Sequence, residues 1–269
     1  MMERPPEHAG TPGNRLFRRP SLRGAELAGQ AQAWRVELLL GLLVVLGVSI
    51  PLSLFTELGF TYVVTGTLLF LGLMLIVLHT APAVFRTEGP GPANRVTFLR
   101  AALVVPVAAL VFHPAQQDVA IHAVLVVAVL ALLLDGVDGA VARRWGRVTA
   151  FGARFDMELD ALLIMVLAVL VWQTEKTGAW VLLIGLMRYA FVVAGWYWRW
   201  LEGTLPPSRR RQALCVVQSV ALLIALAPPM PPAGAVAAAL GALALLVYSF
   251  AVDILWLFRH RENVSGQCE

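Results

Sequence analysis

Apolar runs of about 17 to 25 residues follow one another along most of the chain, separated by short charged or Pro- and Gly-rich segments. A helix of about 20 apolar residues spans the hydrocarbon core of a bilayer, where the backbone must satisfy its own hydrogen bonds. Hydrophobic residues make up 59% of the chain and charged residues 14%, which is outside the range of soluble globular domains. We therefore predict an all-α fold, a polytopic transmembrane helical bundle.

The borders of the runs predict about eight spans, with the first two forming a hairpin over residues 35–80. The only Asp, Glu, Lys or Arg within these two spans is Glu37, so we expect a packing or assembly hairpin without chemistry of its own. The eight runs are 36–56, 59–80, 96–113, 118–142, 153–173, 178–200, 212–228 and 234–258.

Basic residues gather on one side of the predicted bundle. When the spans are threaded alternately with the N-terminus inside, Lys176 is the only one of the 21 Lys and Arg residues that falls outside, and Arg100 and Arg188 fall within or near spans. Short cytoplasmic loops carry an excess of Lys and Arg. We expect a multi-pass protein of the cell (inner) membrane with both termini in the cytoplasm.

The two ends of the chain are then cytoplasmic tails. Residues 1–34, rich in Pro, Arg and Gly, are expected to be flexible, with room for a short interfacial helix near their end, and residues 259–269 form a second tail. Arginines next to spans suit anionic lipid headgroups, so membrane lipids are the expected polyanionic partner and nucleic acid is not.

One charged segment, DGVDGAVARRWGRVTAFGARFDMELD, joins two apolar runs. Asp135 and Asp138 lie three residues apart at the end of one predicted helix, and Asp156 and Asp160 lie four apart at the start of the next, so each pair shares a helix face. Because the chain reverses between them, a helical hairpin brings the four carboxylates to a comparable depth on the cytoplasmic side.

Four ionised carboxylates in one place repel one another, and each costs roughly 2.5–3.5 kcal/mol to insert into a membrane. Positive charge must lie among them, either from arginines such as Arg143 and Arg154 or from hard divalent cations, which take oxygen ligands. Four carboxylates that converge from two helices favour two Mg²⁺ or Mn²⁺ ions. Small residues beside them, among them Gly136, Ala140 and Ala153, let a helix backbone or a flat ligand approach closely.

Written in full, the segment reads Asp135-x₂-Asp138-Gly139-x₂-Ala142-Arg143-x₈-Gly152-x₃-Asp156-x₃-Asp160. At every defined position it resembles the signature of the CDP-alcohol phosphatidyltransferases, integral membrane enzymes of phospholipid synthesis. The stretch PANRVTFLR at 92–100 is similar to the entry of the family's first core helix, through Asn94, Thr97 and Arg100. The resemblance covers about residues 92–258, six spans, which is the size of the family's core.

The resemblance implies a metal-dependent transfer of a phosphatidyl group from CDP-diacylglycerol to a polar alcohol, such as glycerol 3-phosphate or an inositol phosphate, with release of CMP. It implies that Asp135, Asp138 and Asp156 ligate the metals, and that Asp160 bridges to the metals and acts as general base. It also implies a homodimer. The residues it assigns to the CDP moiety are Gly139, Ala142, Arg143, Gly152, Asn94, Thr97 and Arg100.

Charged residues outside the signature have two interpretations each. Arg188 is a lone cation within a span, so it either binds an acceptor phosphate or pairs with a carboxylate, for which Asp253 is one candidate. Glu158 projects about 160° away from Asp156 and Asp160 and is expected to meet an arginine or the membrane interface. Arg209, Arg210 and Arg211 either replace the basic residues that many family members carry before Gln218 or set the topology.

Two other functions remain open at this stage. A CDP-choline or CDP-ethanolamine type of transfer to diacylglycerol is the alternative chemistry, and a transporter could use the carboxylates to bind cations. Transporter charges lie near the midplane and often on several helices. The four aspartates instead gather toward one face in one hairpin, which favours the enzyme.

Overall fold

The computed structural model describes residues 20–81, 92–145, 150–203 and 208–260, and in these ranges every regular element is a helix. Each predicted apolar run corresponds to one α-helix, which confirms the all-α prediction. The α-helices are α1 (Pro20–Phe55), α2 (Gly59–Thr80), α4 (Pro92–Leu110), α5 (Gln117–Trp145), α6 (Ala150–Gln173), α7 (Leu182–Tyr197), α8 (Arg209–Leu226) and α9 (Pro232–Arg259). Short 3₁₀ helices are η1 (Pro114–Gln116), η2 (Ala179–Val181) and η3 (Arg199–Glu202).

Five of the described helical segments are long and apolar enough to cross a membrane, judged by length and composition. They are Val36–Phe55, Gly59–Thr80, Pro114–Gly136, Ala179–Tyr197 and Pro232–Arg259. Helices α4, α6 and α8 are not among these five segments. Large apolar side chains such as Leu43 and Leu68 point outward, exposed by 69% and 63%. The protein is a multi-pass membrane protein whose outer surface suits lipid.

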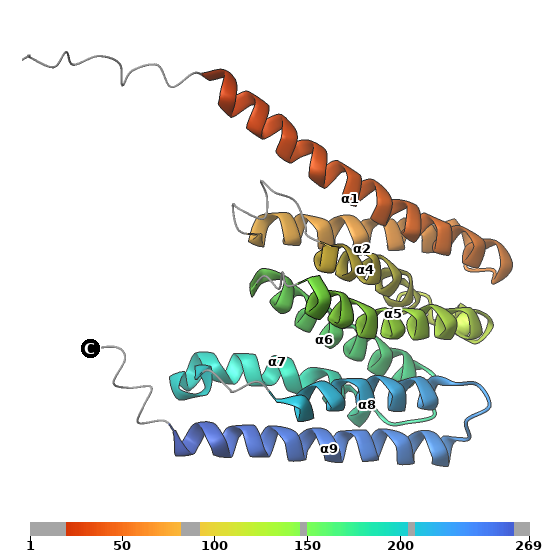
Figure 1. The fold of residues 1–269 in the computed structure, drawn as a ribbon. Coiled ribbons are helices and arrows are strands. Elements are labelled where there is room, and N and C mark those ends of the chain that lie inside the picture. The colour runs from red at the N-terminus through yellow and green to blue at the C-terminus, as the bar shows by residue number, and fades with distance from the viewer. Residues whose placement is uncertain (1–19, 82–91, 146–149, 204–207, 261–269) are drawn as a thin grey trace, which may run out of the picture.

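Helix α1 extends further toward the N-terminus than its apolar run. It begins at Pro20, inside the segment expected to be a tail, and Figure 1 shows this part projecting beyond the other helices. Residues 1–19 and 261–269 lie outside the described residues, so most of what we predict for the two tails concerns chain that the structure does not describe.

The helices form successive layers, with α4 between the N-terminal hairpin and the rest (Figure 1). Helix α4 packs against α1 and α2 on one side and against α5 and α6 on the other. Helix α6 also packs against α7 and α8, and α8 packs against α9. The order of layers therefore places α4, α5 and α6 at the centre of the bundle.

The N-terminal hairpin is attached to α4 by both apolar and polar contacts. Phe70 of α2 is buried in one cluster with Phe98 and Ala102 of α4. The buried Tyr62 hydroxyl donates a hydrogen bond of 2.7 Å to the Pro106 carbonyl of α4. At the start of the first span, Glu37 Oε1 lies 2.8 Å from Arg95 Nε, and this pairing accounts for a carboxylate that is only 5% exposed.

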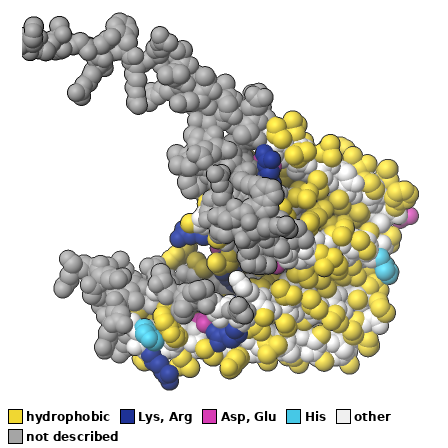
Figure 2. Space-filling model, in the orientation of Figure 1, with side chains coloured by type: hydrophobic (Ala, Val, Ile, Leu, Met, Phe, Trp, Pro, Cys, Tyr) yellow, Lys and Arg dark blue, Asp and Glu magenta, His cyan; other side chains and the backbone are white. Residues whose placement is uncertain are grey.

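Charged side chains are unevenly distributed over the surface. Figure 2 shows hydrophobic side chains over most of the visible described surface, with Lys and Arg gathered toward the side where α9 ends. This distribution agrees with the one-sided placement of basic residues expected from the sequence.

Helices α6 and α7 approach closely at Gly185. A Cβ atom placed there would lie 2.7 Å from the Met165 Cα and 2.9 Å from its Sδ, so Gly185→Ala must push α7 away from α6. Overpacking of this kind costs about 1–3 kcal/mol, and we expect the apparent Tm in detergent to fall by about 3–8 °C.

The matched control is Gly241→Ala in α9. Its added Cβ would meet no other described atom within 4 Å, and alanine is the better helix former. We therefore expect an unchanged or higher Tm. Equal effects of the two substitutions would contradict the close approach of α6 and α7.

Candidate active site

Three aspartates from α5 and α6 come together beside α4. Asp135 belongs to α5, and Asp156 and Asp160 lie one turn apart on α6, with one carboxylate oxygen of each residue within 4.8 Å of the others. All three side chains are partly exposed, by 24%, 36% and 27% respectively. The i, i+4 spacing on α6 and the reversal between the two helices produce this arrangement. Three of the four aspartates singled out from the sequence therefore lie together.

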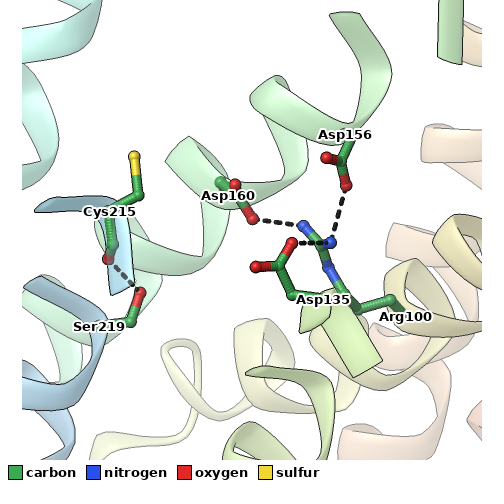
Figure 3. Close-up of polar contacts among 6 residues, drawn as sticks. All are labelled: Arg100, Asp135, Asp156, Asp160, Cys215 and Ser219. Atoms are coloured by element: carbon green, nitrogen blue, oxygen red, sulfur yellow. Dashed lines mark hydrogen bonds and ion pairs between the residues drawn. The ribbon is translucent and has the colours of Figure 1, made fainter. Parts of the chain in front are cut away.

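Arg100 of α4 lies among these carboxylates (Figure 3). Its Nη1 is 2.5 Å from Asp135 Oδ1 and 2.7 Å from Asp156 Oδ1, and its Nη2 contacts Asp160 Oδ1. The Arg100 side chain is 1% exposed. A guanidinium presents several N–H donors in a planar fork, which allows one side chain to contact three carboxylates. One buried cation thus links three helices.

The family resemblance implies that Arg100 binds the CDP moiety, and in the structure its guanidinium lies at the aspartates. Asn94 and Thr97 precede it at three-residue intervals on the same face of α4, and both are buried. The signal that could have located Arg100 was available. A lone cation in an apolar helix calls for a carboxylate, and this holds for Arg100 as it does for Arg188.

Several residues of the signature are described only by their backbone. Asp138, Gly139, Ala142 and Arg143 lie in α5, but their side chains fall outside the described residues. Gly152 is buried in α6. Arg154, one of the two arginines proposed to neutralise the carboxylates, is exposed.

The three aspartates fit a hard divalent cation. Among the described residues they form the one group of three or more Asp, Glu, His or Cys side chains that could hold an ion. Carboxylate oxygens are the ligands that Mg²⁺ and Mn²⁺ favour, and a carboxylate has two oxygens, so it can contact both an arginine and an ion. The donor set and its spacing could therefore hold a divalent cation.

With this geometry established, the comparison with known proteins identifies the family. The family model for CDP-alcohol phosphatidyltransferase matches residues 92–251, from the first residue of α4 into α9. The chain belongs to the CDP-alcohol phosphatidyltransferase family. Helices α1 and α2, which form the N-terminal hairpin, lie outside the matched region.

A curated relative covers a shorter stretch. The archaetidylinositol phosphate synthase of Aeropyrum pernix is 47% identical over 60 residues, which is 22% of this chain and 31% of that protein. The matched stretch thus spans about a third of the relative's length. No solved structure matches the chain significantly.

In this member of the phosphatidyltransferase family, Arg188 pairs with a carboxylate other than the one suggested from the sequence. Its Nη2 lies 2.6 Å from Glu158 Oε1, and the two side chains are 29% and 57% exposed. The suggested pairing with Asp253 is wrong, because α7 packs closely along α6, which carries Glu158. Glu158 meets an arginine, as its direction on α6 predicted.

Asp253 of α9 instead forms ion pairs with two arginines of α8. Arg210 Nη2 contacts Asp253 Oδ1, and Arg211 Nη1 lies 3.8 Å from Oδ2. The Asp253 side chain is only 14% exposed. Arg210 and Arg211 therefore join α8 to α9, in addition to any effect on topology.

Helix α8 lies beside the aspartates on the side away from Arg100. Figure 3 shows Cys215 and Ser219 of this helix across from Asp160, and the Ser219 hydroxyl donates a hydrogen bond of 3.1 Å to the Cys215 carbonyl. Gln218, on the same face, is buried. Small and polar side chains thus line α8 where it comes near the carboxylates.

The two arginine pairs differ in burial, so their loss should differ in cost. We expect Asp253→Asn to lower the apparent Tm in detergent by about 4–8 °C, because it leaves two arginines beside a part-buried neutral amide. Glu158→Gln should change Tm by less than about 2 °C, because exposed ion pairs contribute about 0–1 kcal/mol. A larger loss in Glu158→Gln than in Asp253→Asn would contradict these assignments.

Proposed function

We propose that the protein transfers a phosphatidyl group from CDP-diacylglycerol to a polar alcohol and releases CMP. The observation that carries this proposal is the cluster of Asp135, Asp156 and Asp160 on α5 and α6, within the region that matches the family model and in the segment that resembles the family's signature. The reaction belongs to phospholipid biosynthesis and depends on a divalent cation.

A phosphorylated polyol is the acceptor that we propose. The relative from Aeropyrum pernix is named as an archaetidylinositol phosphate synthase, which supports an inositol phosphate over glycerol 3-phosphate. Arg188 is the candidate that would hold the acceptor phosphate. Its partner Glu158 is more than half exposed, so an anion can replace it at modest cost.

The signature aspartates would hold two Mg²⁺ or Mn²⁺ ions, with Asp138 joining Asp135, Asp156 and Asp160. When bound, such ions supply positive charge that stabilises a pyrophosphate during transfer. The CDP moiety would lie along the small residues Gly139, Ala142 and Gly152, with Arg143 offering paired donors to a phosphate or base edge. Asn94 and Thr97 of α4 complete the proposed nucleotide side.

Asp160 would accept the proton of the acceptor hydroxyl. The acceptor oxygen then forms a bond to the lipid-bearing phosphorus of CDP-diacylglycerol. The bond from that phosphorus to the bridging oxygen breaks, and its electron pair leaves with CMP. No covalent bond to the protein is needed, so the residues act by holding, orienting and accepting one proton.

We also propose the membrane in which the enzyme lies and its orientation there. The excess of Lys and Arg on one side of the bundle supports both termini and the active site in the cytoplasm, in the cell (inner) membrane. A homodimer is included on the strength of the family resemblance alone.

Purified protein incubated with CDP-diacylglycerol, Mn²⁺ and a panel of alcohols should release CMP and form one new phospholipid. We expect Asp135→Asn and Asp156→Asn to abolish this release and to weaken Mn²⁺ binding, because an amide keeps the shape but loses the charge. Asp160→Asn should lower turnover by about 10²–10⁴-fold.

Asp118→Asn provides the control, since Asp118 lies exposed in the first turn of α5, far along the helix from Asp135. It should keep full activity. Absence of CMP release with every acceptor, from protein that binds Mn²⁺, would refute the transferase and point to a cation transporter. Release of CMP only from CDP-choline or CDP-ethanolamine with diacylglycerol would move the protein to the alternative chemistry.

The acceptor contact has its own test in Arg188→Gln, with Glu158→Gln as the paired control. If Arg188 holds an acceptor phosphate, its loss should raise the acceptor KM by about 10-fold or more and leave the CDP-diacylglycerol KM unchanged. Glu158→Gln should leave both constants within about two-fold. Equal damage to donor and acceptor kinetics in a stably folded Arg188→Gln protein would refute the phosphate contact.

A further inference from the structure

The contacts of Arg100 extend across three helices and involve proposed metal ligands on two of them. The guanidinium on α4 contacts Asp135 on α5 and both Asp156 and Asp160 on α6. The Arg100 side chain is 1% exposed and the three carboxylates are partly exposed, so water screens these contacts less than it screens surface ion pairs. In the described part of the chain, Arg100 is the arginine that balances this group of carboxylates.

The carboxylates would be unstable together without such a charge. One oxygen of each aspartate lies within 4.8 Å of the others, and like charges at this separation repel strongly where water is scarce. Whenever no divalent cation is bound, this repulsion has to be offset by charge that belongs to the chain itself.

We propose that Arg100 is a resident counter-cation, which assembles the carboxylate site in the metal-free protein and lowers the affinity of the site for divalent cations. This inference rests on the proposed metal-dependent function. It assigns Arg100 a positioning role, since it acts through the aspartates.

The two parts of the proposal have one electrostatic cause. A carboxylate bonded to a guanidinium through one oxygen attracts a second cation less strongly, and the guanidinium repels that cation directly. The attraction that stabilises the metal-free site therefore opposes metal binding. Removing Arg100 should weaken the empty protein and strengthen the binding of the ion.

The decisive measurement is thermal unfolding of the full-length protein in detergent, first with EDTA and then across a Mn²⁺ titration. For Arg100→Gln we expect the apparent Tm in EDTA to fall by about 5–10 °C, because removing one partner leaves partly buried like charges together. Saturating Mn²⁺ should recover most of that loss. Mn²⁺ binding followed by electron paramagnetic resonance should tighten by about 3- to 10-fold relative to the wild type.

The matched control is Arg95→Gln on the same helix, since Arg95 is 63% exposed and pairs with Glu37 away from the aspartates. It should leave the Mn²⁺ affinity and the Mn²⁺-dependent gain in Tm unchanged. Arg100→Lys keeps the charge and should retain most of the stability in EDTA. An unchanged Tm of Arg100→Gln in EDTA, or a Mn²⁺ affinity equal to or weaker than that of the wild type, would overturn the proposal.

A second variant keeps the test decisive if Arg100→Gln does not fold. Adding Asp156→Asn removes one of the repelling charges, so Arg100→Gln/Asp156→Asn should recover folded protein. A double variant that also fails to fold would overturn the proposal.

The measurements in EDTA need no substrate, and this separates the inference from the proposed function. A wild type without CMP release, whose Arg100 variants behave as expected, would refute the reaction and leave the counter-cation in place. An active wild type whose Arg100→Gln variant has the same Tm would support the reaction and refute the counter-cation.

Discussion

Ionised groups within an apolar bundle are tolerated only beside opposite charge, and this constraint organises the centre of the molecule. Asp135, Asp156 and Asp160 bring negative charge from the α5–α6 hairpin, and Arg100 brings positive charge from α4. Because the guanidinium contacts all three, α4 is bonded to both helices of the hairpin. The same contacts that make the charges tolerable therefore fix the relative positions of the helices that carry the site.

Ion pairs around the site also place an arginine beside a carboxylate, but their arginines are less buried than Arg100. Arg188 and Glu158 join α7 to α6, and Arg210 joins α8 to Asp253 of α9. Each pair lies across an interface between neighbouring helices, where the long arginine side chain can reach a carboxylate from the next layer. Apolar packing determines which helices are neighbours, and the ion pairs then connect those neighbours at defined points.

The sequence predicted the helices well because lipid leaves a chain few alternatives. Each apolar run became a helix, and the spacing of Asp156 and Asp160 placed both on one face of α6. The partners of the charged residues were harder to predict, since hydropathy gives the depth and face of a residue but not the neighbouring helix. Asp253 was therefore a wrong partner for Arg188, and the position of Arg100 among the aspartates was missed.

The residue at which α1 begins could not be predicted from hydropathy either. Pro20 to Arg35 precede the apolar run and carry no membrane signal, yet α1 begins at Pro20. Hydropathy marks where a helix meets lipid, whereas the helix itself continues for as long as the local residues permit.

The hairpin formed by α1 and α2 also limits the directions from which a lipid can approach the candidate active site. Phe70 of α2 is packed with Phe98 and Ala102, which lie two residues before and two residues after Arg100 on α4. A lipid tail that approached the carboxylates across α4 would have to separate these side chains, at the cost of opening a buried apolar contact. The hairpin therefore covers the α4 flank of the site, and under the proposed function a membrane-borne substrate would approach the aspartates from another side of the bundle.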